Sequence, residues 1–65
     1  MNNEVWTLDK DCLAAYTEDS NIMQKVKRSY PMFTVMATYQ KEGRVIAVQY
    51  KVPKAKRRAA LRLFR

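Results

Sequence analysis

The chain has 65 residues, 48% of them hydrophobic, a formal net charge of +7, one cysteine and no histidine. This length suits one domain with a modest core, and the single Cys12 excludes an internal disulfide. A usual zinc site lacks its ligands, and no apolar run approaches the roughly 20 residues of a membrane-spanning helix. We therefore expect one globular, cytoplasmic domain over residues 1–65, without a cofactor and without membrane contact.

The charge is unevenly distributed along the chain. Residues 1–20 have a net charge of −4, whereas residues 21–65 carry 12 basic side chains against the single acidic Glu42, a net charge of +11. A basic segment this concentrated is typical of proteins that bind an anionic partner, most often nucleic acid. The alternative interpretation is a solvated basic surface without a partner.

The N-terminal residues predict a short lead-in followed by a helix. Residues 4–8 are apolar and alternating enough to form a strand or an extended segment, with Trp6 as a core anchor. Residues 9–16 have the character of a helix, because Asp9 is a good N-cap for the apolar positions that follow. Cys12 lies on the apolar face of that helix and is interpreted as a small buried residue.

A second helix is expected over residues 21–29. The polar residues 17–21 prefer caps and turns, since their side chains compete for backbone hydrogen bonds, and Asp19 or Ser20 would cap the new helix. Pro31 ends it. Its apolar residues recur at helical spacing: Ile22, Met23, Val26 and Tyr30.

Residues 32–40 and 45–52 are rich in β-branched and aromatic residues and flank the only glycine, Gly43. This pattern predicts a β-hairpin with its turn at Glu42 and Gly43. Strand alternation brings the two apolar sets together in one register, with the pairs Tyr39–Ile46, Ala37–Val48, Val35–Tyr50 and Phe33–Val52. The residues expected to face the core are Phe33, Val35, Tyr39, Ile46, Val48 and Val52.

The chain closes with a predicted amphipathic helix over residues 54–65, for which Pro53 is the start signal. Its small apolar side consists of Ala55, Ala59, Ala60, Leu63 and Phe64, and its opposite side of Lys54, Arg57, Arg58, Arg62 and Arg65. The predicted fold class is therefore α+β: a small winged-helix-like domain with two short helices, a β-hairpin and a C-terminal basic amphipathic helix.

The residues do not favour catalysis. The N-terminal carboxylates are explained by capping, and one glycine is too few for a phosphate-binding loop, so we expect no enzyme activity. Binding is favoured instead, because basic and amide side chains gather on the second helix, at the hairpin tip and on the closing helix. The candidate DNA-binding residues are Asn21, Gln24, Lys25, Lys27, Arg28, Lys41, Arg44, Lys54, Arg57, Arg58, Arg62 and Arg65.

Three segments resemble excisionase-type and MerR-like winged-helix DNA-binding domains. Residues 6–16, with the lead-in Trp-Thr-Leu-Asp, resemble the opening helix of these domains; residues 19–28 resemble the start of their recognition helix; and residues 50–54 resemble the strand that ends in proline before their closing helix. The resemblance implies a small phage or mobile-element regulator, or an excisionase-like architectural factor, that binds duplex DNA. It also implies cooperative self-association on adjacent sites.

Two other functions are consistent with the sequence. A small inhibitor or adaptor protein would bind another protein through the hairpin edge, using Met32, Met36 and Tyr39. An RNA-binding protein would stack Tyr39, Tyr50 or Phe33 on bases. The salt dependence of the binding affinity distinguishes nucleic-acid binding from a hydrophobic protein contact, since only the former weakens steeply as the salt concentration rises.

Overall fold

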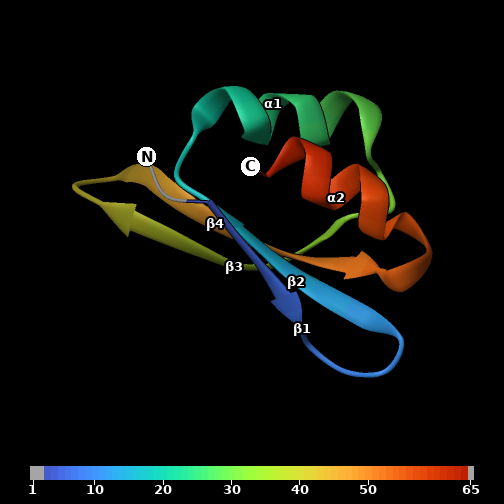
Figure 1. The fold of residues 1–65 in the computed structure, drawn as a ribbon. Coiled ribbons are helices and arrows are strands. Elements are labelled where there is room, and N and C mark those ends of the chain that lie inside the picture. Colours follow the sequence, from blue (N-terminus) through green and yellow to red (C-terminus); the bar gives the residue numbers. More distant parts are fainter. Residues whose placement is uncertain (1–2, 65) are drawn as a thin grey trace.

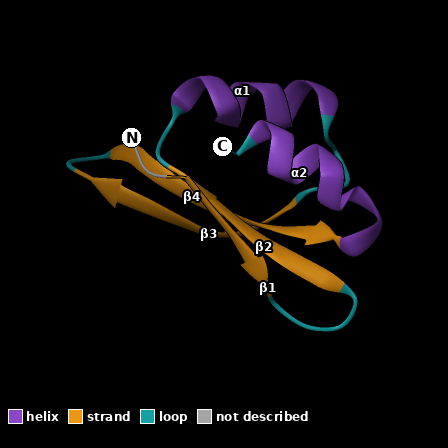
Figure 2. Ribbon diagram, in the orientation of Figure 1, coloured by secondary structure: helices purple, strands orange, loops and turns teal. Residues whose placement is uncertain are grey.

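The computed structural model describes residues 3–64, which form two β-hairpins, each followed by a helix (Figure 1). The strands make one antiparallel sheet in the order β1-β2-β4-β3. Both helices cover the same face of this sheet, and the opposite face is open in the described part of the chain (Figure 2). The elements are β1 (Asn3–Thr7), β2 (Cys12–Thr17), α1 (Ser20–Ser29), β3 (Thr34–Lys41), β4 (Arg44–Pro53), the 3-10 turn η1 (Lys54–Lys56) and α2 (Arg57–Leu63).

The predicted winged-helix architecture is wrong, because residues 9–16 form a turn and the strand β2 in place of the expected first helix. Asp9 caps the turn between β1 and β2 instead of a helix. Its carboxylate accepts hydrogen bonds from the backbone N–H groups of Asp11 and Cys12, both at 2.8 Å. The molecule is a small α+β fold built on a four-stranded sheet.

Pairing on both sides explains why β2 is a strand. It lies between β1 and β4, so both edges of its backbone are hydrogen-bonded within the sheet. Leu13, Ala15 and Thr17 face the helices, and they stand opposite Val52, Tyr50 and Val48 of β4. Ala15 is completely buried, and its small side chain lets the helices approach the sheet closely. Alanine favours a helix in isolation, but this burial and pairing outweigh its local preference.

Helix α1 confirms the predicted second helix. Asp19 is its N-cap and accepts the backbone N–H of Asn21 at 2.8 Å. Ile22 and Val26 are buried against the sheet, and the backbone N–H of Tyr30 closes the last turn on the Val26 carbonyl at 2.9 Å. The local capping and periodicity signals therefore suffice for this element.

Replacing the cap by Asp19→Ala is expected to lower the free energy of unfolding by about 1 kcal/mol, because an N–H at the helix start loses its acceptor. Urea denaturation followed by circular dichroism measures this change. Ser20→Ala, at the next position, is the matched control, and its effect should be clearly smaller. An unchanged denaturation midpoint for Asp19→Ala would show that the cap contributes no stability.

The β3–β4 hairpin confirms the predicted turn. Glu42 and Gly43 both have positive φ, 54° and 78°, as a two-residue turn of the I′ type requires. The expected pair Val35–Tyr50 is also observed.

Between residues 36 and 46 the predicted register is wrong, whereas the pairs Gln40–Val45 and Lys41–Arg44 beside the turn fit it again. The pairing shifts by one residue at Met36 on β3 and again at Ile46 on β4, which places Ala37 opposite Gln49 and Tyr39 opposite Ala47. A bulge of this kind turns the following side chains to the other face of the sheet. The expectation that Val35, Tyr39 and Ile46 are core residues is wrong, since they are 53%, 45% and 47% exposed. The bulge explains Tyr39, which stands opposite Ala47, but not Val35, which precedes the bulge and pairs with Tyr50 as predicted.

The core lies between the sheet and the two helices. The predicted core residues Phe33, Val48 and Val52 are confirmed there, and the Phe33 ring contacts other rings of the core. The ring centroids of Tyr30 and Phe33 are 5.0 Å apart, and those of Phe33 and Phe64 are 6.3 Å apart. The other buried hydrophobic residues of the cluster are Leu13, Ala15, Ile22, Val26, Tyr50 and Ala60.

Two predictions about single apolar residues are wrong. Trp6 is 39% exposed and does not anchor the core. Ala55 is exposed because the first turn after Pro53 is η1, whose 3-10 geometry shifts the phase of the side chains relative to α2. Ala60 and Phe64 are buried as expected.

Candidate nucleic-acid interface

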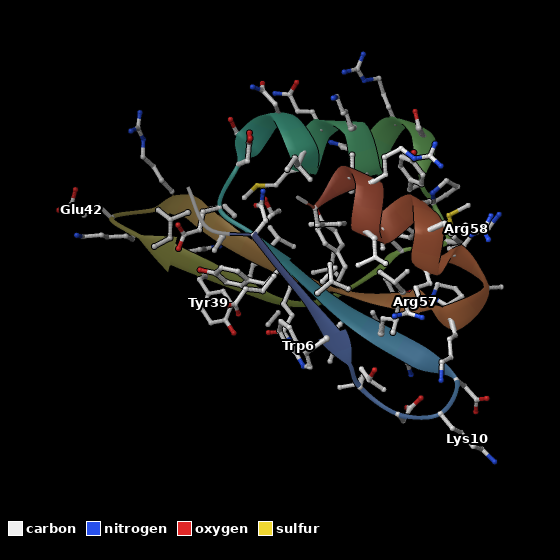
Figure 3. All side chains as sticks on the ribbon, viewed as in Figure 1. Trp6, Lys10, Tyr39, Glu42, Arg57 and Arg58 are labelled. Atoms are coloured by element: carbon white, nitrogen blue, oxygen red, sulfur yellow. The ribbon has the colours of Figure 1, made fainter. Side chains whose placement is uncertain are left out.

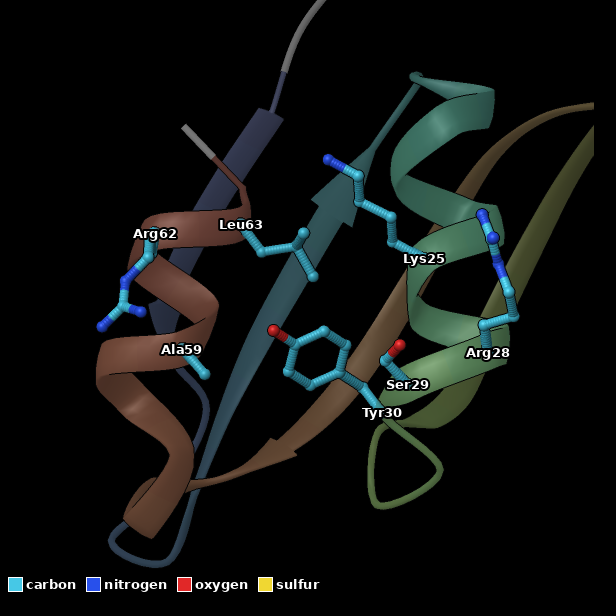
Figure 4. A pocket seen from close by; sticks show the side chains of 7 residues that line it. All are labelled: Lys25, Arg28, Ser29, Tyr30, Ala59, Arg62 and Leu63. Atoms are coloured by element: carbon cyan, nitrogen blue, oxygen red, sulfur yellow. The ribbon is translucent and has the colours of Figure 1, made fainter.

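Helix α1 and the segment η1–α2 lie side by side on the sheet and run in opposite directions (Figures 1 and 4). Together they carry eight basic side chains and no acidic residue. We call this surface the basic helix layer. All eight side chains are exposed: Lys25, Lys27, Arg28, Lys54, Lys56, Arg57, Arg58 and Arg62.

The layer is basic because each helix buries only a narrow apolar stripe. On α1 that stripe consists of Ile22 and Val26, with Met23 half-buried beside it. On α2 it consists of Ala60, with Leu63 half-buried. The remaining positions face solvent, and lysine and arginine occupy most of them. Packing the two stripes on one face of the sheet turns both basic surfaces the same way.

A groove of about 500 Å³ separates the two helices (Figure 4). Its lining residues are Lys25, Arg28, Ser29, Tyr30, Ala59, Arg62 and Leu63. The Tyr30 hydroxyl points across the groove towards α2, and the Lys25 side chain extends above it. Cations on both rims and a hydroxyl between them suit the phosphate oxygens of an extended polyanion.

The outward edge of α1 carries polar side chains at helical spacing. Asn21, Gln24 and Arg28 follow one another at intervals of three and four residues, and all are exposed. Side chains at these intervals share one face of a helix. Amide and guanidinium groups can hydrogen-bond to base edges in a major groove.

The structure brings most of the predicted binding residues together, but not all of them. The candidates on α1, η1 and α2 share the basic helix layer. Lys41 and Arg44 flank the β3–β4 turn, and the Glu42 between them lies at the opposite end of the molecule from Arg58 (Figure 3). Arg65 lies outside the described residues.

Sequence reasoning missed Lys10. It lies in the β1–β2 turn, and that turn is tied to η1 because the backbone N–H of Lys54 donates to the Asp11 carbonyl at 2.9 Å. Lys10 and Arg57 therefore lie at the same end of the molecule (Figure 3). With residues 9–16 interpreted as a helix, no signal in the sequence indicated this proximity.

The aromatic residues proposed for base stacking divide into two groups. Phe33 and Tyr50 are buried in the core, at 5% and 4% exposure, so stacking on a base is wrong for both. Burial raises the pKa of the Tyr50 phenol above its usual value. Tyr39 is exposed and remains available.

Apolar side chains gather on the β3–β4 hairpin. An apolar groove of about 330 Å³ lies beside α1, and Val35 and Val45 on its wall are 53% and 48% exposed. Pro31 and Lys27 also line it. This is the part of the molecule that suits a protein partner best.

Within residues 3–64, no helix combines the length and apolar character needed to cross a membrane. The same residues contain no group of three or more histidine, cysteine, aspartate or glutamate side chains placed to hold a metal ion.

No family model, curated protein or solved structure matches this chain. The resemblance to excisionase-type domains therefore stays a prediction from residues 6–16, 19–28 and 50–54. The first of these segments contains β1 and β2 residues rather than a helix.

Proposed function

We propose that the protein binds duplex DNA without catalysis and that its basic helix layer is the contact surface. The supporting observation is that eight exposed cations on α1, η1 and α2 gather on one face of the sheet, with no acidic residue in these elements. Such a surface attracts the phosphate backbone and gives affinity that falls with salt.

The two helices have different roles in this proposal. The arginines of α2 contact phosphates, which position the protein but carry no sequence information. Helix α1 has ten residues, a length of about 15 Å at 1.5 Å per residue, and presents Asn21, Gln24 and Arg28 to base edges in the major groove.

We also propose that several copies of the protein bind cooperatively at adjacent sites on the DNA. A domain of 65 residues offers a small interface, so specific binding by one copy is weak. Cooperative filling of adjacent sites supplies the missing affinity, as in an architectural factor or regulator of a phage or mobile element. The single cysteine, half-buried and free, suits a cytoplasmic location.

Two single substitutions separate the roles of the helices. Arg58→Ala should weaken binding to all duplexes and flatten the dependence of log K on log salt by about 0.9, the contribution of one phosphate contact. Gln24→Ala should cost on the order of 1–3 kcal/mol at a preferred site only. Fluorescence anisotropy with a selected and a scrambled duplex at several salt concentrations measures both effects.

The proposal fails if neither substitution alters the affinity for duplex DNA and the unmodified protein releases DNA at low salt. Circular dichroism of each variant provides the control for folding. Both residues are exposed, so their substitution should leave the fold unchanged.

A second candidate function is favoured by the apolar surface of the β3–β4 hairpin. Val35, Met36, Val45 and Ile46 are 42–53% exposed, and β3 is an edge strand whose backbone is paired only with β4. Edge strands of this kind invite pairing with another chain. An inhibitor or adaptor acting here would bind its partner with little salt dependence and would tolerate Arg58→Ala.

A further inference from the structure

The sheet face opposite the helices carries an aromatic band formed by Trp6 on β1, Tyr16 on β2 and Tyr39 on β3. Trp6 and Tyr39 are 39% and 45% exposed, and both project from the sheet away from α1 and α2 (Figure 3). The sequence did not indicate this band, because Trp6 was expected in the core and the bulge at Met36 places Tyr39 on this face.

Small residues lie beside the aromatic rings in the sheet. Ala14 stands between Trp6 of β1 and Lys51 of β4 in the register, and Ala47 stands opposite Tyr39. Both alanines are on the open face, yet they are only 0% and 1% exposed. Small residues flanked by rings produce a flat surface with raised aromatic side chains.

Hydrogen bonds and ring contacts hold the tyrosines in place. The rings of Tyr16 and Tyr39 meet edge to face, with centroids 6.0 Å apart and planes at 66°. The Tyr16 hydroxyl donates to the Glu18 carboxylate at 2.8 Å, and this bond raises the pKa of the Tyr16 phenol. The Tyr39 hydroxyl donates to Gln49 at 3.4 Å. The two tyrosines of the band are therefore held in place before any partner arrives.

The polar side chains beside the band suit a nucleotide. Gln49 occupies the strand position next to Tyr16, and Lys51 lies one row further along β4, next to Ala14. The Gln49 oxygen accepts the Tyr39 hydroxyl, and its amide nitrogen donates to the Met36 Sδ at 3.8 Å, a long contact that a base edge can replace. An ammonium can contact a phosphate. Glu4 and Glu18 lie towards the β1–β2 side, so a phosphate chain runs more favourably along the β4 side over Lys51.

We propose that this open face binds a short stretch of single-stranded nucleic acid. Bases stack on Trp6 and Tyr39, Gln49 contacts a base edge and Lys51 contacts the backbone. Stacking of bases on exposed aromatic rings tolerates any sequence, and the net charge of +7 attracts the strand. The site is on the face opposite the basic helix layer, so it is a second binding surface and does not depend on the proposed duplex contact.

Trp6 is the only tryptophan of the sequence, so the intrinsic tryptophan fluorescence reports on this site alone. Titration with an oligothymidine of eight nucleotides should quench the Trp6 fluorescence to saturation, since stacking places a base on the indole. Tyr39→Ala should weaken this binding by about tenfold to a hundredfold, the usual effect of removing one stacking ring. Tyr39→Phe, which keeps the ring, should stay within about twofold of the unmodified protein.

Anisotropy of a labelled octamer extends the test to Trp6→Ala, for which the same tenfold to hundredfold loss is expected. Leu61→Ala is the control on the other face, since Leu61 is 42% exposed on α2, and it should have no effect. Circular dichroism verifies the fold of each variant. Tyr39→Ala keeps the test decisive even if Trp6→Ala does not fold.

Absence of quenching, or an affinity for the octamer that survives both Tyr39→Ala and Trp6→Ala, overturns this inference. A Trp6 fluorescence that changes with protein concentration in the absence of the octamer also overturns this inference, because a second copy of the protein would then cover the open sheet face. Loss of octamer binding through Lys25→Gln with Arg62→Gln, and not through Tyr39→Ala, would assign the single strand to the basic helix layer. If the double variant loses duplex binding but keeps octamer binding, both proposals are supported. If the unmodified protein binds the octamer but no duplex, only the proposed duplex-binding function is rejected.

Discussion

Val52→Asp is expected to cost the protein a large part of its stability. Val52 is completely buried and stands opposite Leu13 in the centre of the sheet, beneath the helices. An unpaired charge in such a site costs about 3–5 kcal/mol. The total stability of a domain of this size is only about 3–10 kcal/mol, at 0.05–0.15 kcal/mol per residue. The cost therefore equals or exceeds the net stability at the lower end of this range and removes about a third to a half of it at the upper end.

The matched control is Val45→Asp, on the same strand. Val45 is 48% exposed, so an aspartate there keeps its hydration and should change the stability by less than about 1 kcal/mol. Thermal denaturation followed by circular dichroism compares the two variants. A cooperative transition in Val52→Asp at the temperature of the unmodified protein would contradict the arrangement of the core described above.

Removing two charges from the basic helix layer is expected to produce the largest change in DNA binding. Lys25→Gln combined with Arg62→Gln takes one cation from each rim of the groove between α1 and α2. If each cation neutralises one phosphate, the slope of log K against log salt becomes shallower by about 1.8. At 0.1 M salt the same two contacts correspond to roughly sixtyfold weaker binding.

Lys41→Gln combined with Arg44→Gln provides the control with the same change in net charge. These residues flank the β3–β4 turn, at the end of the molecule remote from α2. Their removal should leave the slope within about 0.3 of that of the unmodified protein, because they lie outside the helix layer. Equal effects of the two double variants would show that net charge alone controls the affinity and that the helix layer is not the interface.

The two proposed surfaces have opposite chemistry on opposite faces of one sheet. The helix-covered face is basic, and its described rings lie in the core, as Tyr50 and Phe64 do with centroids 5.9 Å apart. The open face exposes Trp6 and Tyr39. If both proposals hold, the protein binds a duplex and a single strand at the same time, and the octamer does not compete with a duplex in a binding assay.

Local chemistry in the sequence determined several elements. Asp19 caps α1, and its apolar positions Ile22 and Val26 recur at helical spacing. Gly43 follows Glu42 in a turn that requires positive φ. Each of these signals acts between residues close together in the chain, so it is readable without knowledge of the rest of the molecule. The separation of charge is equally a property of the sequence.

Tertiary structure decided the remainder. Asp9 and the alanines after it are compatible with a helix, and only the pairing of β2 with both β1 and β4, far along the chain, makes this segment a strand. The bulge at Met36 likewise results from fitting β3 to β4, and it decides that Tyr39 faces solvent. Strand pairing and burial depend on residues distant in sequence, and a one-residue shift reverses the face of every side chain beyond it.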